Sequence, residues 1–288
     1  MLTVRRTATM LTGATVALVL GAGAATAAEP TTNVSTNTAP VAVLLTGAGT
    51  SIVTYGIANN RVMNTRAVTG LTGDTSLVGI DYRVQNARMY GVGNAGGLYI
   101  VSTTGASNKI KQLTVPLDGT RFGVDFNPVA NALRIISNTG QNLRQPFADI
   151  KLATVADGAL NYTAGVTATG VVAAAYTNND IVDTSATTLF DIDAGLDQVA
   201  VQAPANSGSL SLTGKLGVDV SPNAGFDIFT TLGSDGRATG NDGYVVDSGA
   251  TSTSFSTVQL LTGKLTSVAT LQLVATDIAV IIAQRPAV

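Results

Sequence analysis

A four-residue motif recurs along this chain and limits the folds that it can adopt. Glycine, an apolar residue, aspartate and a second apolar residue follow one another at residues 79–82, 123–126 and 217–220. The first two copies begin 44 residues apart, and the interval of 94 residues to the third leaves room for one degenerate copy, at residues 171–176. A repeat of this length is typical of propeller blades, which need neighbours to bury their faces.

The segments around the motif have the pattern of short strands joined by tight turns. Runs of Val, Ile, Leu, Tyr and Thr alternate with Gly, Asn, Asp and Pro, and helical periodicity is absent. Four strands in about 40 to 50 residues make one blade. Three strands at 41–47, 51–57 and 61–68 precede the first motif, and one strand at 276–283 ends the chain. We expect these four to form one sheet that closes the ring.

The sequence therefore predicts an all-β fold, a β-propeller with five four-stranded blades closed by pairing of the N- and C-terminal strands. Residues 233–257 are rich in Gly, Ser and Thr, and we interpret them as a long loop, with a sixth blade as the alternative. A β-sandwich also has many short strands, but it accounts neither for the repeat nor for the final strand. The five blades are expected at residues 41–70 with 276–283, 77–116, 121–160, 165–205 and 215–273.

The first 28 residues have the order of a secretory signal peptide. Arg5 and Arg6 precede an apolar run at 14–20, and small residues lead to Ala28. The run is shorter than the roughly 20 residues that span a bilayer. We expect removal of this segment and a secreted, extracellular monomer without a membrane partner. The expected parts are a signal peptide at 1–28, a disordered leader at 29–40, a single domain at 41–283 and a tail at 284–288.

The composition excludes several classes of chemistry. The chain has no His and no Cys, and Glu29 is its only Glu. A Ser-His-Asp triad, a thiolate nucleophile and a Cys-ligated zinc site therefore cannot form. The net charge of −2, with 12% charged residues, provides no basic surface for nucleic acid. An enzyme would have to work with Asp, Tyr and Arg alone, so we expect no catalytic residues.

The aspartates of the motif are candidate metal ligands. Asp81, Asp125 and Asp219 occupy equivalent places on strands that face the axis, and we interpret Ala175 and Ala279 as the corresponding residues of the other two units. A ring of carboxylates can hold Ca²⁺. The alternative is that each aspartate accepts hydrogen bonds from nearby backbone N–H groups, and this alternative is the stronger one. No other cofactor is expected.

Two polar segments are candidates for a ligand-binding patch. Residues 137–144 and 177–180 each follow a strand, and we expect both segments to lie on one face of the ring. Their amides and their single guanidinium can form hydrogen bonds with a sugar or a peptide. The alternative is that these asparagines stabilise turns. The candidate residues are Asn138, Asn142, Arg144, Asn178 and Asn179.

Five phrases in order resemble the secreted bacterial proteins that carry the domain of unknown function DUF4394. They lie at residues 122–128, 134–144, 173–179, 188–193 and 216–219, and the resemblance covers roughly residues 44–280. The run at 137–144 is the most distinctive. The resemblance implies a propeller-like extracellular domain. The family carries no agreed catalytic residues, so no residue role follows from it.

These observations favour a non-catalytic extracellular domain that binds, or serves as a scaffold for, a protein or a glycan. One alternative is an Asp-dependent extracellular hydrolase or a lactonase-like propeller enzyme. Another is a structural protein of the cell surface or matrix, which the low charge and the Thr, Gly and Ala content also fit.

Overall fold

The computed structural model describes residues 40–282, apart from residue 183. The expected signal peptide, nearly all of the expected leader and the expected tail therefore lie outside the described residues. Within the described part, no helix has the length and apolar character needed to cross a membrane.

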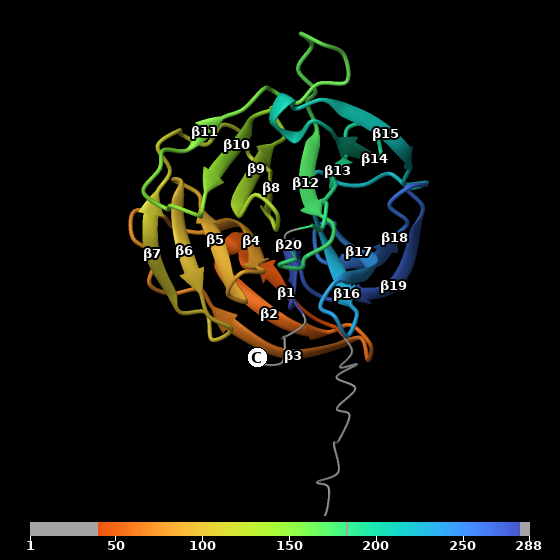
Figure 1. Cartoon of the computed structure of the whole chain (residues 1–288). Coiled ribbons are helices and arrows are strands. Elements are labelled where there is room, and N and C mark those ends of the chain that lie inside the picture. The colour runs from red at the N-terminus through yellow and green to blue at the C-terminus, as the bar shows by residue number, and fades with distance from the viewer. Residues whose placement is uncertain (1–39, 183, 283–288) are drawn as a thin grey trace, which may run out of the picture. The chain divides into compact units, whose positions relative to one another are not determined.

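The described residues form five antiparallel sheets of four strands, arranged around a central axis as the blades of a β-propeller (Figure 1). In blades 2 to 5 the chain enters at the innermost strand and runs outward. The predicted fold class is confirmed. Blade 1 contains β20 (Ala275–Val280), β1 (Val41–Thr46), β2 (Ser51–Gly56) and β3 (Arg61–Ala67), from the axis outward.

The other four blades follow one another along the chain. Blade 2 contains β4 (Leu77–Arg83), β5 (Arg88–Gly93), β6 (Gly97–Val101) and β7 (Ser107–Gln112). Blade 3 contains β8 (Phe122–Asn127), β9 (Ala132–Ser137), β10 (Asn142–Pro146) and β11 (Val155–Ala156). Blade 4 contains β12 (Val171–Tyr176), β13 (Leu189–Asp193), β14 (Gln198–Gln202) and β15 (Leu210–Lys215). Blade 5 contains β16 (Ala224–Leu232), β17 (Ala238–Ser248), β18 (Thr253–Val258) and β19 (Leu265–Leu271).

The ring closes as predicted. Strand β20 pairs antiparallel with β1, with Leu44 opposite Ile278 and Ala42 opposite Val280. Because β20 is also the innermost strand of its sheet, the last strand of the chain completes the first blade. This pairing removes two sheet edges that would otherwise be open.

The hydrophobic core lies between neighbouring blades. Between blades 1 and 5, for example, the ring of Tyr55 meets that of Phe255 edge to face at 5.1 Å, beside Leu44 and Ile278, and all four side chains are buried. Each blade thus buries its two faces against two neighbours, which is why a single blade would not be stable alone.

The glycine of the repeated motif is explained by the close approach of the innermost strands. A Cβ atom on Gly123 would lie 2.5 Å from the backbone nitrogen of Ala174, and one on Gly225 would lie 2.5 Å from the Cα of Asp277. Real side chains do not tolerate such contacts, so glycine lets adjacent inner strands pack at the axis.

Two details of the predicted fifth blade are wrong. Residues 217–220 do not form its inner strand, because Gly217 has a φ of +80° and Asp219 is an exposed residue outside any strand. The inner strand is β16, which carries the same motif at residues 225–228. Residues 233–257 are not a long loop either, since they contain β17 and most of β18. Strand β17 pairs with both β16 and β18, and this pairing stabilises a strand whose two glycines, two aspartates and one asparagine have weak intrinsic preference for a strand.

Candidate functional site

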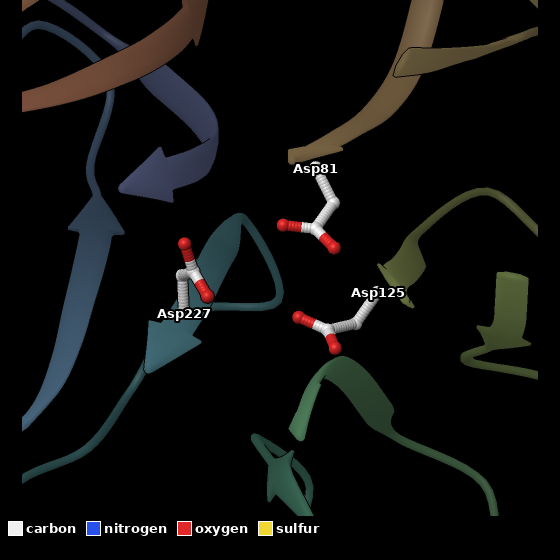
Figure 2. A group of neighbouring side chains, drawn as sticks. All are labelled: Asp81, Asp125 and Asp227. Carbon is white, nitrogen blue, oxygen red and sulfur yellow. The ribbon is translucent and has the colours of Figure 1, made fainter. Parts of the chain in front are cut away.

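A cluster of buried aspartates lies where the five inner strands surround the axis. The motif position is Asp81 in β4, Asp125 in β8, Ala175 in β12, Asp227 in β16 and Ala279 in β20, and Asp277 lies two residues before it in β20. The carboxyl groups of Asp81, Asp125 and Asp227 point toward one another (Figure 2), and one oxygen from each lies within 4.8 Å of the others. The structure therefore brings two of the three predicted ligands together.

One part of the predicted ring needs correction. Asp219 lies outside the cluster, and Asp227 takes its place, because the inner strand of blade 5 begins after Asp219. Ala279 holds the motif position of β20, as predicted, because the N–H of Val280 reaches Asp227 in the way that the N–H of Phe126 reaches Asp81. Asp277, two residues earlier in the strand, is a further axial carboxylate that the motif did not predict. Ala175 does occupy the equivalent position in blade 4.

Each of the four carboxylates accepts a backbone hydrogen bond from the inner strand of the next blade. The N–H of Phe126 donates to Oδ2 of Asp81 at 2.7 Å, which links blade 2 to blade 3. Asp81 also accepts the N–H of Tyr82 in its own strand at 2.6 Å. The alternative that the aspartates satisfy backbone groups is thus what the structure shows. The remaining interblade donors are the N–H groups of Tyr176 to Asp125, of Val280 to Asp227 and of Ile80 to Asp277.

Burial strongly disfavours the ionised form of these carboxyl groups. It raises the pKa of Asp81, Asp125 and Asp277 well above the ordinary value and raises the pKa of Asp227 to about 6. The charge of Asp227 further raises the pKa of Asp81, and that of Asp81 raises the pKa of Asp125. Near neutral pH such a cluster either keeps protons or attracts a cation.

The joint between blades 4 and 5 is held differently, because Ala175 has no carboxylate. Here the N–H of Asn178 donates to Oδ1 of Asn241 at 2.9 Å, and Nδ2 of Asn241 donates to Oδ1 of Asn178 at 2.8 Å. Asn179 donates its N–H to the hydroxyl of Thr230. Asn178 also has a φ of +57°, which asparagine tolerates. These contacts give two of the five predicted ligand-binding residues a structural role.

Asn138 also supports the backbone around it. Its Oδ1 accepts the N–H groups of Thr120 and Arg121 at 2.9 and 3.1 Å. It therefore fixes the segment that leads into β8.

The turn that contains Asn138 and the segment 177–180 lie on opposite faces of the ring, so the expectation that the two polar segments share one face is wrong. Ser137 pairs with Phe122, the first residue of β8, so the following turn with Asn138 lies at the amino end of that inner strand. Asn178 follows Tyr176, the last residue of β12. The two inner strands run side by side in the same direction, since the N–H of Tyr176 reaches Asp125. We call the face at which the inner strands end the carboxyl-end face.

A cavity of about 300 Å³ lies between blades 3 and 4 toward the carboxyl-end face. Two arginines from adjacent strands of blade 3, Arg134 and Arg144, contribute to its lining. Tyr176 contributes from the end of β12. Pro204 and Asn206 belong to the segment between β14 and β15. The cavity therefore includes Arg144, one of the residues that the sequence singled out.

Both arginines of this cavity bind the same carboxylate. Nη1 of Arg134 lies 2.7 Å from Oδ2 of Asp157, and Nε of Arg144 lies 3.0 Å from that oxygen. Arg134 also donates to Oδ1 of Asn142 at 2.8 Å and to Oδ1 of Asn206 at 2.7 Å. Asn142, another predicted residue, is buried and positions Arg134 beside the cavity.

Sequence reasoning missed Arg134, Tyr176 and Asp157. A signal for Arg134 exists, because a charged residue in the otherwise apolar strand β9 needs a buried partner. The partner Asp157 follows the two-residue strand β11 and carries no motif. A second cavity of about 290 Å³ lies on the same face, among loops after β4, β8 and β12, with Gln85, Asn131 and Asp180 in its lining.

The fold and these sites define a five-bladed β-propeller with a carboxylate-lined axis and cavities on the carboxyl-end face. The chain belongs to the DUF4394 family, a domain of unknown function, whose match covers residues 51–279. The resemblance found in the sequence is thereby confirmed. No curated protein matches the chain.

Solved structures similar to this chain are distant in sequence. A protein of unknown function from Bacteroides thetaiotaomicron is 15% identical, with a TM-score of 0.45 over 80% of this chain and 62% of that one. A protein of unknown function from Bacteroides caccae is 10% identical, with a TM-score of 0.37 over 81% and 73% of the two chains. An auxiliary nutrient binding protein from Bacteroides thetaiotaomicron is 15% identical, with a TM-score of 0.37 over 70% and 49%.

Proposed function

We propose that this protein is a secreted, non-catalytic binding module that takes an extracellular glycan on its carboxyl-end face. The observation that carries the proposal is the cavity of about 300 Å³ between blades 3 and 4. Its polar lining is held by a network in which Asp157, Asn142 and Asn206 fix the two guanidinium groups. Preorganised polar groups around a concave surface are typical of ligand sites.

A glycan array probed with the labelled protein tests this function. Ala130 lines the cavity and is exposed, so Ala130→Trp should fill the cavity without removing a polar group. We expect the wild type to bind a subset of glycans and Ala130→Trp to lose them. Ala153→Trp, at an exposed position outside the cavity lining, is the matched control and should bind as the wild type does. An empty array, or equal binding by Ala130→Trp, would contradict the function.

A structural calcium ion at the axis is a second proposal. The observation that favours it is the group of three carboxylate oxygens within 4.8 Å of one another, the hard oxygen ligands that Ca²⁺ prefers. Thermal unfolding in excess CaCl₂ and in EDTA tests it. We expect a higher midpoint with calcium in the wild type and no difference in Asp125→Asn. An equal midpoint in the wild type would reject the ion.

A further inference from the structure

The charges around the cavity between blades 3 and 4 are unequal. Arg134 and Arg144 contribute two positive charges and share the single carboxylate of Asp157. The side chains of Arg134 and Asp157 are 2% and 6% exposed, so solvent screens this pair poorly. One carboxylate neutralises only one of two guanidinium groups. A positive charge is therefore left at the cavity.

A second acid, Asp191, lies near this interface without a hydrogen bond to either guanidinium. Asp191 lies on β13 and is fully buried, and neither of its oxygens has a hydrogen-bond partner among the described residues. Burial raises the pKa of Asp191 well above the ordinary value, although the charge of Arg134 acts in the opposite direction. Asp191 forms no ion pair with either guanidinium, and the two arginines with Asp157 carry a net charge of one.

Arg144 keeps donor capacity that the fold does not use. Its Nε and Nη2 donate to the two oxygens of Asp157 at 3.0 and 3.2 Å. In the part of the chain that the structure describes, no group accepts a hydrogen bond from its Nη1. The side chain is 28% exposed and lines the cavity, so this nitrogen is accessible to a ligand. A guanidinium edge of this kind recognises the oxygens of an anion.

The rest of the lining suits a small polar ring. Ala130, Ala132 and Pro204 provide apolar surface, against which the C–H groups of a sugar can pack. Asn206 uses its carbonyl oxygen on Arg134, so its amide N–H groups can donate to a ligand. The volume lies at the lower end of the range for small-molecule sites.

We propose that this cavity binds the singly charged oxyanion of an acidic sugar, a carboxylate or a sulfate ester, with Nη1 of Arg144 as the charged donor. The inference rests on the proposed glycan-binding function and deepens it. One net positive charge balances a monoanion, whereas the second charge of a phosphate monoester would stay uncompensated. Neutral sugars would leave the unused donor of Arg144 without an anionic partner.

Isothermal titration of the full chain with four matched sugars tests the inference. The ligands are glucuronate, glucose 6-sulfate, glucose 6-phosphate and methyl glucoside. We expect binding of glucuronate, glucose 6-sulfate or both, and weaker binding of the phosphate and of the neutral glucoside. Comparison of the first two identifies whether the carboxylate or the sulfate is preferred. Arg144→Gln should weaken the preferred acidic sugar by about 10- to 100-fold, the usual effect of one charge-assisted hydrogen bond.

Arg121→Gln is the matched control. Arg121 is exposed just before β8, at the opposite face, so the same change in charge there should leave the affinity unaltered. If Arg144→Gln does not fold, Arg144→Lys serves instead, and its retained charge should preserve weak binding. The inference is overturned if methyl glucoside binds as tightly as the acidic sugars, if the phosphate binds most tightly, or if Arg144 and Arg121 variants behave alike. If the array shows glycan binding, those results overturn only the preference for an acidic sugar. An array without binding rejects the glycan-binding function and this inference together.

Discussion

At the residue scale, each axial aspartate links two blades through one side chain. Asp81 accepts an N–H from its own strand and another from β8, and both bonds are buried. Bonds of this type stabilise a fold because an unsatisfied buried N–H costs about 1 to 3 kcal/mol. One carboxyl oxygen of each of Asp81, Asp125 and Asp227 also lies within 4.8 Å of the others. When these groups ionise, their mutual repulsion opposes the stabilisation that the hydrogen bonds provide.

This repulsion predicts that the free energy of unfolding in metal-free buffer falls as the pH rises. The pKa of Asp227 is raised to about 6 and those of Asp81 and Asp125 are raised well above the ordinary value, whereas unfolded aspartate titrates near 3.9. Their contribution to the free energy of unfolding is therefore fully present below about pH 3.9 and is lost as the pH rises through the folded values. Asp125→Asn keeps an oxygen for the N–H of Tyr176 and removes one charge, so its stability should fall less from pH 4 to pH 7.

Urea unfolding in EDTA at several pH values measures this difference, which we expect to be of the order of 1 kcal/mol. Asp219→Asn is the control, because Asp219 is an exposed residue outside the cluster. Equal slopes against pH for the two variants would show that the axial carboxyl groups are not coupled to stability.

The residue scale also explains which ligands were predictable. Asp81 and Asp125 follow a glycine that the inner strands require, so the motif identifies them. Residues 217–220 and 225–228 both fit the pattern of glycine, apolar residue, aspartate and apolar residue, and only pairing with β17 decides which becomes a strand. Asp277 lies two residues before the motif position of its strand, which Ala279 holds, so the motif overlooks it.

At the element scale, the segment after β12 replaces an axial carboxylate as the link between blades 4 and 5. The side-chain amide of Asn241 donates to Oδ1 of Asn178, and the main-chain N–H of Asn178 donates to Oδ1 of Asn241. Sequence alone places Asn178 in a turn but does not reveal its partner, because the partner lies 63 residues away on another blade. The polar patch was predicted from composition, whereas strand direction decides which face each segment occupies.

This link predicts coupling between two asparagines. Asn178→Ala and Asn241→Ala should each lower the free energy of unfolding by about 1 to 2 kcal/mol, and the double variant should lose less than the sum. Chemical denaturation of the three variants gives the coupling energy. Binding of the array ligands should stay unchanged, since neither residue lines the cavity between blades 3 and 4. Additive losses, or lost binding at constant stability, would reassign Asn178 to a ligand site.

At the scale of the whole molecule, stability depends on closure of the ring by β20. This strand covers β1 on one side and contacts the inner strands of blades 2 and 5 through Asp277 and Val280. Ile278 and Ala279 are fully buried, so removal of β20 would expose apolar surface in three blades at once. Because every blade depends on two neighbours, the loss cannot stay local.

We therefore expect a chain that lacks residues 276–288 to show no cooperative thermal unfolding. A circular permutant separates the need for β20 from the need for an intact C-terminus. The N–H of Ile281 donates to the carbonyl of Val41 at 2.8 Å, so a short linker can join residue 282 to residue 40. New ends at Gly165, in an exposed loop between blades 3 and 4, leave every strand present. The permutant should unfold cooperatively near the wild-type midpoint, as followed by circular dichroism. A truncated chain with an unchanged midpoint would show that four complete blades and one open sheet suffice for this fold.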